Sequence, residues 1–110
     1  VDSSALTSIG NDLCFGDIFS RQVEALGHQG DILWGLSTSG ASANVIKAFE
    51  AGRTAGMGCL AFCGNPGSKL EALADISLTV SCGNTGRIQE VHLLAGHIIC
   101  QLVEQHFLKS

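Results

Sequence analysis

The sequence has few basic residues and no long apolar run. Six Lys and Arg stand against ten Asp and Glu in 110 residues, so the net charge is −4 and the isoelectric point is near 5.4. Binding nucleic acid through its phosphates relies on a basic surface, and this charge gives no sign of one and so argues against such binding. Polar residues interrupt every apolar stretch before the roughly 18 residues of a membrane helix, and no secretory leader is evident. We therefore expect a cytoplasmic protein without nucleic-acid or membrane partners.

The cysteines lack the spacing of a zinc knuckle or a redox pair. They are odd in number and lie in apolar segments: Cys14, Cys59, Cys63, Cys82 and Cys100. This usage is typical of reduced thiols in a cytoplasmic protein and not of a disulfide framework. We interpret Cys59 and Cys63, which lie in one predicted strand, as core residues.

What the sequence does contain is an alternation of strands and helices. A hydrophobic share of 45% and a charged share of 15% are typical of a well-buried globular protein, and we predict one domain over 1–110. Apolar runs and turn signals predict strands at 5–9, 32–36, 59–63 and 76–80, and helices at 15–26, 42–56, just after Ser68, and 87–107. Such alternation with short connections predicts an α/β fold with a parallel sheet.

The stretch 30–44 combines a strand, a hydroxyl-rich turn and the start of a helix. Four hydroxyl residues lie between the strand and the helix: Ser37, Thr38, Ser39 and Ser42. A strand-to-helix turn presents free N–H groups and the positive end of the helix dipole, which attract phosphate. Gly40 allows close approach of a ligand to the backbone. The alternative is that Ser39 or Ser42 only caps the helix.

The C-terminal helix is apolar around much of its circumference, so we predict that it is mostly buried, between the sheet and another subunit. One narrow stripe is polar: Glu90, His97, Gln101 and Glu104. The stripe is either a solvated face or the place from which His97 projects into a cleft as a general acid or metal ligand, with Gln89 holding substrate or metal. His92 lies on a different side of this helix from His97, which excludes a two-histidine metal face.

Several segments together resemble a known family. Residues 30–45 resemble the signature of the sugar isomerase (SIS) domain. The Gly10-Asn11-Asp12 turn, residues 17–21, and the segment 87–92 followed by His97 are similar to the phosphoheptose isomerases within that superfamily. The resemblance implies isomerisation of sedoheptulose 7-phosphate to D-glycero-D-manno-heptose 7-phosphate for lipopolysaccharide or other surface glycans. It also implies a flavodoxin-like three-layer α/β/α sandwich and a homotetramer.

The resemblance also implies roles for individual residues. Four hydroxyl residues would hold the substrate phosphate: Ser37, Thr38, Ser39 and Ser42. Asp12 would line the site, Gln89 would contact substrate, and His97 would act as an acid/base group. Family members that bind zinc use the residues matching Gln89 and His97, together with a histidine and a glutamate from an earlier helix.

The chain departs from the family at its start and at one position near the last helix. The family's N-terminal helices, first strand, Asn-Gly-Gly-Ser turn and expected catalytic glutamate have no counterpart, and Gly86 stands where some members carry aspartate. We therefore expect a fragment that binds phosphate weakly and catalyses poorly alone. Two alternatives stay open: a non-catalytic scaffold, such as a relative that binds a replication initiator, and a phosphosugar-sensing module of a transcription regulator.

Overall fold

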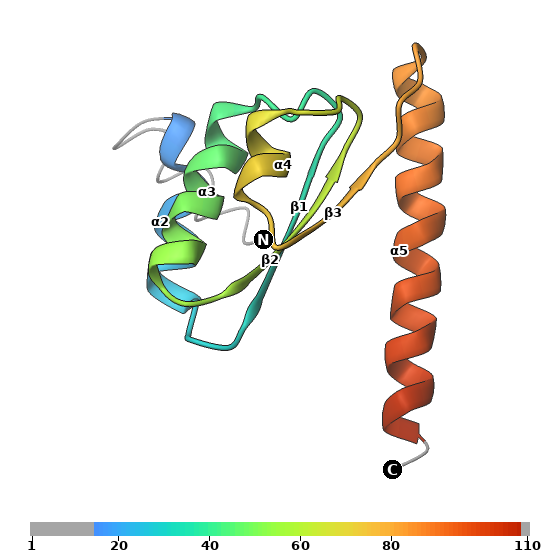
Figure 1. Cartoon of the computed structure of the whole chain (residues 1–110). Helices are drawn as coiled ribbons and strands as arrows, with labels where there is room; N and C mark the ends of the chain where they lie inside the picture. Colours follow the sequence, from blue (N-terminus) through green and yellow to red (C-terminus); the bar gives the residue numbers. More distant parts are fainter. Residues whose placement is uncertain (1–14, 109–110) are drawn as a thin grey trace.

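The computed structural model describes residues 15–108 (Figure 1). The predicted strand at 5–9 and the turn containing Asp12 lie outside the described residues. The elements follow one another as a 3-10 turn η1 (Phe15–Asp17), α2 (Ser20–Leu26), β1 (Ile32–Ser37), α3 (Ala43–Thr54), β2 (Gly58–Cys63), α4 (Lys69–Leu73), β3 (Ile76–Thr79) and α5 (Thr85–Leu108). The three strands and the helices between them confirm the predicted alternation.

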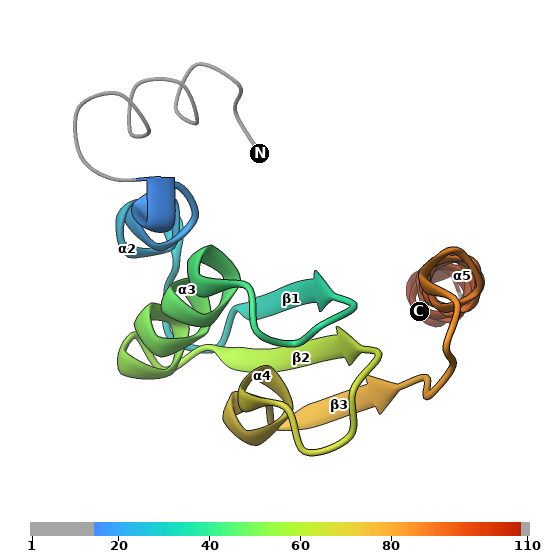
Figure 2. The same cartoon turned by 90° about the horizontal axis from the view of Figure 1, so that it is seen from above.

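The described strands form one parallel sheet in the order β1-β2-β3. Figures 1 and 2 together show α3 and α4 on one face of this sheet, α2 beside α3, and α5 on the opposite side. This arrangement confirms the predicted three-layer α/β/α architecture. All three strands run toward the same edge, where the connections to α3, α4 and α5 begin, and ligands of open parallel sheets bind at such an edge.

The core lies between β1, β2 and helices α3 and α4. Phe49 of α3 is fully buried, and so are Ala61, Cys63 and Leu70. Phe49 packs on the backbone of β1 at Gly35, where an added Cβ would lie 2.4 Å from the Phe49 ring. Truncating a phenylalanine in such a core costs about 3–5 kcal/mol. This contact holds α3 against β1 and so places the start of α3 at the end of that strand.

Cys59 and Cys63 are both buried in β2, which confirms their interpretation as core residues. The predicted helix at 15–26 is only partly correct, because it is divided into η1 and α2. The Ser20 hydroxyl donates to the Asp17 carbonyl oxygen at 3.4 Å. Short polar side chains that bond to nearby carbonyls compete with the helical hydrogen-bond pattern, and Gly16 lowers the helix propensity further.

The last helix is predicted to be buried between the sheet and another subunit, and the described chain by itself covers little of it. Its burial against another subunit stays a prediction. Only Ile88 and His92 of α5 are buried, whereas Leu94 and Leu102 are 62% and 60% exposed. The 24 residues of α5 span about 36 Å, and the six-residue strands span about 20 Å, so the helix continues past the sheet (Figure 1). Within residues 15–108, no helix is long and apolar enough to cross a membrane.

Candidate functional site

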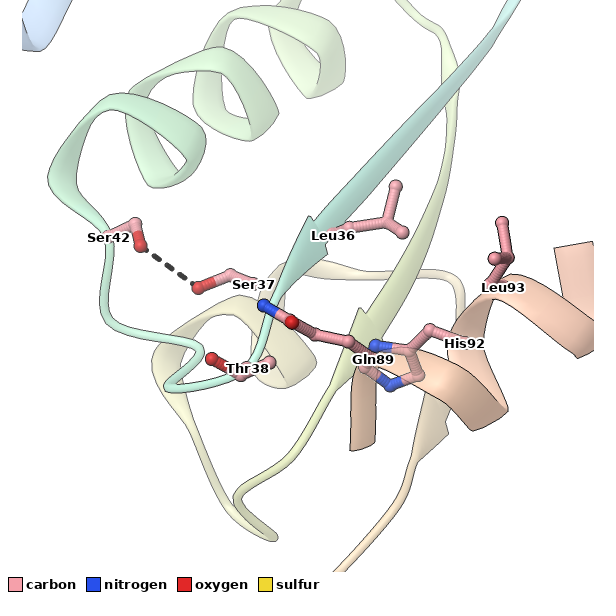
Figure 3. Close-up of a pocket in the computed structure, with 7 residues that line it drawn as sticks. All are labelled: Leu36, Ser37, Thr38, Ser42, Gln89, His92 and Leu93. Carbon is pink, nitrogen blue, oxygen red and sulfur yellow. Dashed lines mark hydrogen bonds between the residues drawn. The ribbon is translucent and has the colours of Figure 1, made fainter. Parts of the chain in front are cut away.

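A cavity of about 520 Å³ lies at the C-terminal end of β1. Its walls come from β1, from the loop at residues 37–42, here called the serine loop, and from the first turns of α5 (Figure 3). Its lining residues are Leu36, Ser37, Thr38, Ser42, Gln89, His92 and Leu93. Four of these were predicted as substrate-binding residues from the sequence. The fold thus brings Gln89 to the serine loop across about 50 residues of chain.

Ser37 is the centre of the hydroxyl cluster in the serine loop. Its side chain is buried, and its Oγ lies 3.0 Å from Ser42 Oγ and 3.4 Å from Ser39 Oγ. The same oxygen accepts a hydrogen bond from the Gly40 amide at 3.1 Å. Because a hydroxyl carries one hydrogen, Ser37 donates to only one of its two neighbours at a time. The remaining hydroxyl hydrogens are available to an acceptor in the cavity, such as a phosphate oxygen.

Ser42 occupies the N-cap position of α3, yet its side chain makes no capping hydrogen bond. The hydroxyl instead contacts Ser37, as the dashed line in Figure 3 shows. Ser39 does not cap α3 either, because its Oγ accepts from the Ala41 amide at 3.1 Å, before the helix begins. The alternative that these serines only cap the helix therefore does not describe their contacts.

The first turns of α5 supply the other wall of the cavity. Gln89 and His92 both line the cavity (Figure 3). His92 is only 3% exposed, and its Nε2 lies 2.8 Å from the carbonyl oxygen of Cys63. Because a carbonyl oxygen only accepts hydrogen bonds, Nε2 carries the hydrogen. This bond fixes the start of α5 to the end of β2 and so determines where Gln89, one turn earlier, stands.

Sequence reasoning assigned no role to His92. The available signal was its position four residues after Ile88, which places both on the helix face that meets the sheet. A histidine on an apolar helix face requires a hydrogen-bond partner when buried. The partner, a backbone carbonyl of β2, could not be identified from sequence because backbone groups carry no sequence signal.

His97 does not line this cavity. It is exposed, about 140° around α5 from the buried His92. The other members of the polar stripe are also exposed: Glu90, Gln101 and Glu104. The described chain therefore brings Gln89, but not His97, to the serine loop, and the acid/base role of His97 stays a prediction.

Gln89 and His97, the predicted zinc ligands of this chain, do not form a zinc site by themselves. Among residues 15–108, no three side chains of the His, Cys, Asp and Glu types lie close enough together to hold a metal ion. Gln89 faces the cavity, and His97 lies on another side of α5. The residues present therefore do not fit a zinc ion without further ligands.

The lining of the cavity carries no permanently charged side chain, and the cysteine beneath the serine loop is a poor nucleophile. None of the seven cavity-lining residues is a lysine, arginine or carboxylate. Cys63, beneath the loop, is fully buried, and burial raises the pKa of its thiol, although a hydrogen bond with Ser68 partly opposes this rise. A thiol with a raised pKa is a poor nucleophile at neutral pH. The site is therefore suited to binding an anion through hydroxyl and amide donors.

Comparison with known proteins gives consistent matches. The model of the SIS domain family matches residues 2–64. The chain is 49% identical over 106 residues to a phosphoheptose isomerase from Helicobacter pylori, covering 96% of this chain and 55% of that protein. It is 50% identical over 109 residues to a phosphoheptose isomerase from Desulfovibrio desulfuricans, covering 99% of this chain and 52% of that protein.

Solved structures agree with these matches. A phosphoheptose isomerase from Neisseria gonorrhoeae superposes with a TM-score of 0.89 at 47% identity, covering 94% of this chain and 59% of that one. One from Francisella tularensis gives 0.90 at 37% identity, with coverages of 94% and 56%. The chain spans about half the length of the curated relatives it matches.

Proposed function

This chain belongs to the SIS domain family, and from that membership we propose that it is the phosphosugar-binding part of a phosphoheptose isomerase. The reaction would interconvert sedoheptulose 7-phosphate and D-glycero-D-manno-heptose 7-phosphate in the cytoplasm, for lipopolysaccharide or other surface glycans. The observation that carries the proposal is the cavity in which Ser37, Thr38 and Ser42 meet Gln89. The sequence identity of 49–50% to phosphoheptose isomerases supports the choice of substrate.

The serine loop would hold the phosphate group. Hydroxyls of Ser37, Thr38 and Ser42 line the cavity, and Ser39 Oγ joins them through Ser37. Hydrogen bonds to an anion are stronger than those between neutral groups, so several hydroxyl donors compensate for the lack of a cation among the lining residues. The phosphate would therefore anchor one end of an extended sugar at the end of β1.

Gln89 would then contact the sugar chain. A glutamine amide both donates and accepts, which suits the hydroxyl and carbonyl oxygens of a sugar. Its place in the same cavity as the serine loop supports this role. His92 would act indirectly, because its bond to the Cys63 carbonyl fixes the turn of α5 that carries Gln89.

Moving a carbonyl between adjacent carbons requires a base for the C–H proton and an acid/base group for the oxygens. We propose His97 for the second task and a residue outside this chain, expected to be a glutamate, for the first. Because His97 lies outside the cavity of its own chain, this role requires another subunit, in agreement with a homotetramer. Zinc, if bound, would require ligands beyond the described residues together with Gln89 and His97.

Calorimetric titration with sedoheptulose 7-phosphate, with unphosphorylated sedoheptulose as the control, tests the binding half of the proposal. We expect the phosphorylated sugar to bind at least about tenfold more tightly, since several charge-assisted hydrogen bonds depend on the phosphate. Equal affinity for the two sugars would contradict a phosphate site in the serine loop.

An isomerisation assay on the intact protein that contains these residues tests the catalytic half. We expect turnover by the intact protein, much less by residues 1–110 alone, and a large loss in the His97→Ala variant. Full turnover by residues 1–110 would contradict the view that the catalytic base lies elsewhere. Phosphosugar binding without turnover by the intact protein would favour a scaffold or sensor.

A further inference from the structure

Three consecutive carbonyl groups of the serine loop accept hydrogen bonds from the segment that follows β2. The Gly64 amide donates to the Thr38 carbonyl at 2.9 Å, and the Leu70 amide donates to the Gly40 carbonyl at 3.1 Å. Between them, the side-chain amide of Asn65 donates to the Ser39 carbonyl at 3.1 Å. Asn65 is thus the one side-chain donor among the three, and the other two donors are backbone amides.

These bonds determine which way the loop amides point. In a trans peptide the carbonyl and the following N–H point in opposite directions. Asn65 holds the carbonyl of the Ser39–Gly40 peptide, and the N–H of that same peptide is shared between Ser37 Oγ and the Ser37 carbonyl oxygen, each at 3.1 Å. The Gly40–Ala41 peptide repeats the pattern, with its N–H bonded to Ser39 Oγ at 3.1 Å. In each of these two peptides the carbonyl oxygen is bonded to the segment that follows β2, and the N–H is bonded to a hydroxyl of the cluster.

The loop also packs tightly on this segment. Gly40 has φ of +67°, a conformation that favours glycine, and a Cβ added there would lie 2.3 Å from Ser68 Oγ. The Gly40 backbone therefore lies directly against Ser68, with no space for a side chain. Loss of one hydrogen bond leaves this packing and the two backbone bonds in place.

We propose that Asn65, which lies outside the cavity, is a positioning residue that keeps the serine loop in its anion-binding shape. The proposal rests on the phosphate-binding function proposed above. Without the Asn65 amide, the carbonyl of the Ser39–Gly40 peptide loses its hydrogen bond. In a fraction of the molecules this peptide then rotates, so that its N–H no longer points toward Ser37. The Ser37 hydroxyl then loses a donor that directs its own hydrogen, and the loop binds anions more weakly.

The test is titration of the parent and of Asn65 variants with sedoheptulose 7-phosphate, and the amide resonance of Gly40 is followed by NMR. We expect Asn65→Ala to weaken binding about three- to tenfold, as befits one net hydrogen bond, and to shift the Gly40 resonance. Asn65→Gln, which keeps the amide donor, restores binding to within about twofold of the parent. Pro66→Ala is the matched control, because it alters the neighbouring residue of the same exposed turn, and it binds like the parent.

The outcomes separate the two proposals. If the parent fails to bind the phosphosugar, the proposed function is wrong and the role of Asn65 falls with it. If the parent binds but Asn65→Ala binds equally well with an unchanged Gly40 resonance, only the role of Asn65 is overturned. Should Asn65→Ala fail to fold, Asn65→Leu keeps the side-chain volume without the donor, and parent-like binding by that variant overturns the proposal equally.

Discussion

The hydroxyl of Ser42 lies 3.0 Å from the hydroxyl of Ser37, although Ser42 stands at the N-cap of α3. Ser68 stands at the N-cap of α4, and there the side chain does accept the amide hydrogen of Glu71, at 3.3 Å. Two serines at equivalent helix positions thus make different contacts. One stabilises its helix, and the other joins the hydroxyl cluster of the cavity.

This contrast predicts opposite effects of the same substitution. Ser42→Ala should leave thermal stability nearly unchanged, because no capping bond is lost, but weaken phosphosugar binding about tenfold through loss of a hydroxyl donor. Ser68→Ala should cost about 1 kcal/mol of stability. Thermal unfolding and calorimetric titration of both variants measure the two effects. If Ser42→Ala lost much stability but bound the phosphosugar like the parent, this prediction would be wrong and Ser42 would only cap α3.

Protonation of Glu71 at low pH should destabilise the turn that contains Gly67. Its carboxylate accepts the Thr79 hydroxyl, and it also accepts the Gly67 amide at 3.2 Å. The Thr79 bond, followed by the Gly67 bond, lowers the pKa of Glu71 below its ordinary value of about 4.5. A lowered folded pKa gives stability that is complete above the ordinary value and is lost as the pH falls through the folded pKa.

Thermal unfolding from about pH 6 to about pH 3 measures this contribution. We expect the parent to unfold at a higher temperature than Glu71→Gln at about pH 6. This difference in unfolding temperature should shrink as the pH falls through the lowered pKa of Glu71. Glu90→Gln is the control, because Glu90 is exposed and forms an ion pair with Arg87, which is exposed as well. Parallel pH profiles for the parent and Glu71→Gln would refute the role of Glu71.

The thiols should divide into two reactivity classes. Cys59 and Cys63 are buried, and burial is the main cause that raises the pKa of each thiol. Cys82 and Cys100 are exposed. Brief iodoacetamide treatment of the native protein, followed by peptide mass spectrometry, should modify Cys82 and Cys100 and spare the β2 pair until denaturant is added. Early modification of Cys63 would mean that the core beneath the serine loop opens readily.

The uncovered face of α5 should mediate self-association, as the proposed tetramer requires. Leu94 and Leu102 are 62% and 60% exposed, and apolar patches of this kind mark protein interfaces. Sedimentation velocity should find the double variant Leu94→Lys/Leu102→Lys smaller than the parent, because lysine is costly to bury at an interface. Gln29→Lys, at an exposed position before β1 and away from α5, is the control and should keep the parent's mass. An unchanged mass for the double variant would exclude this face as the contact.

Much of the fold follows from local signals. Apolar runs bounded by glycines located β1 and β2, and the turn around Pro66 with Ser68 located α4. Burial of α5 could not be predicted in the same way, because periodicity shows that a face is apolar and not whether anything covers it. The division between η1 and α2 depends on a side-chain bond of Ser20 that propensity does not capture.

The site was predictable where it depends on residue type and motif, and less so where it depends on backbone contacts. Ser37, Thr38, Ser42 and Gln89 could be expected in one site because their residue types and motifs are informative, and they line one cavity, whereas Ser39 does not line it. His92 and Asn65 were missed because each bonds to a carbonyl oxygen, 29 and 26 residues away in sequence respectively. Every residue offers such a carbonyl, so its location follows only from the assembled sheet and loops.

The close contact between Gly35 and Phe49 has a consequence for how the sequence can vary. A side chain at position 35 needs space that the Phe49 ring occupies, so Gly35→Ala alone should strain the core and Phe49→Leu alone should leave it underfilled. Together the two changes offset one another in volume, and their energies should be strongly non-additive. We therefore expect a side chain at position 35 to require a smaller residue at position 49, because the glycine that precedes the serine loop leaves room for the Phe49 ring.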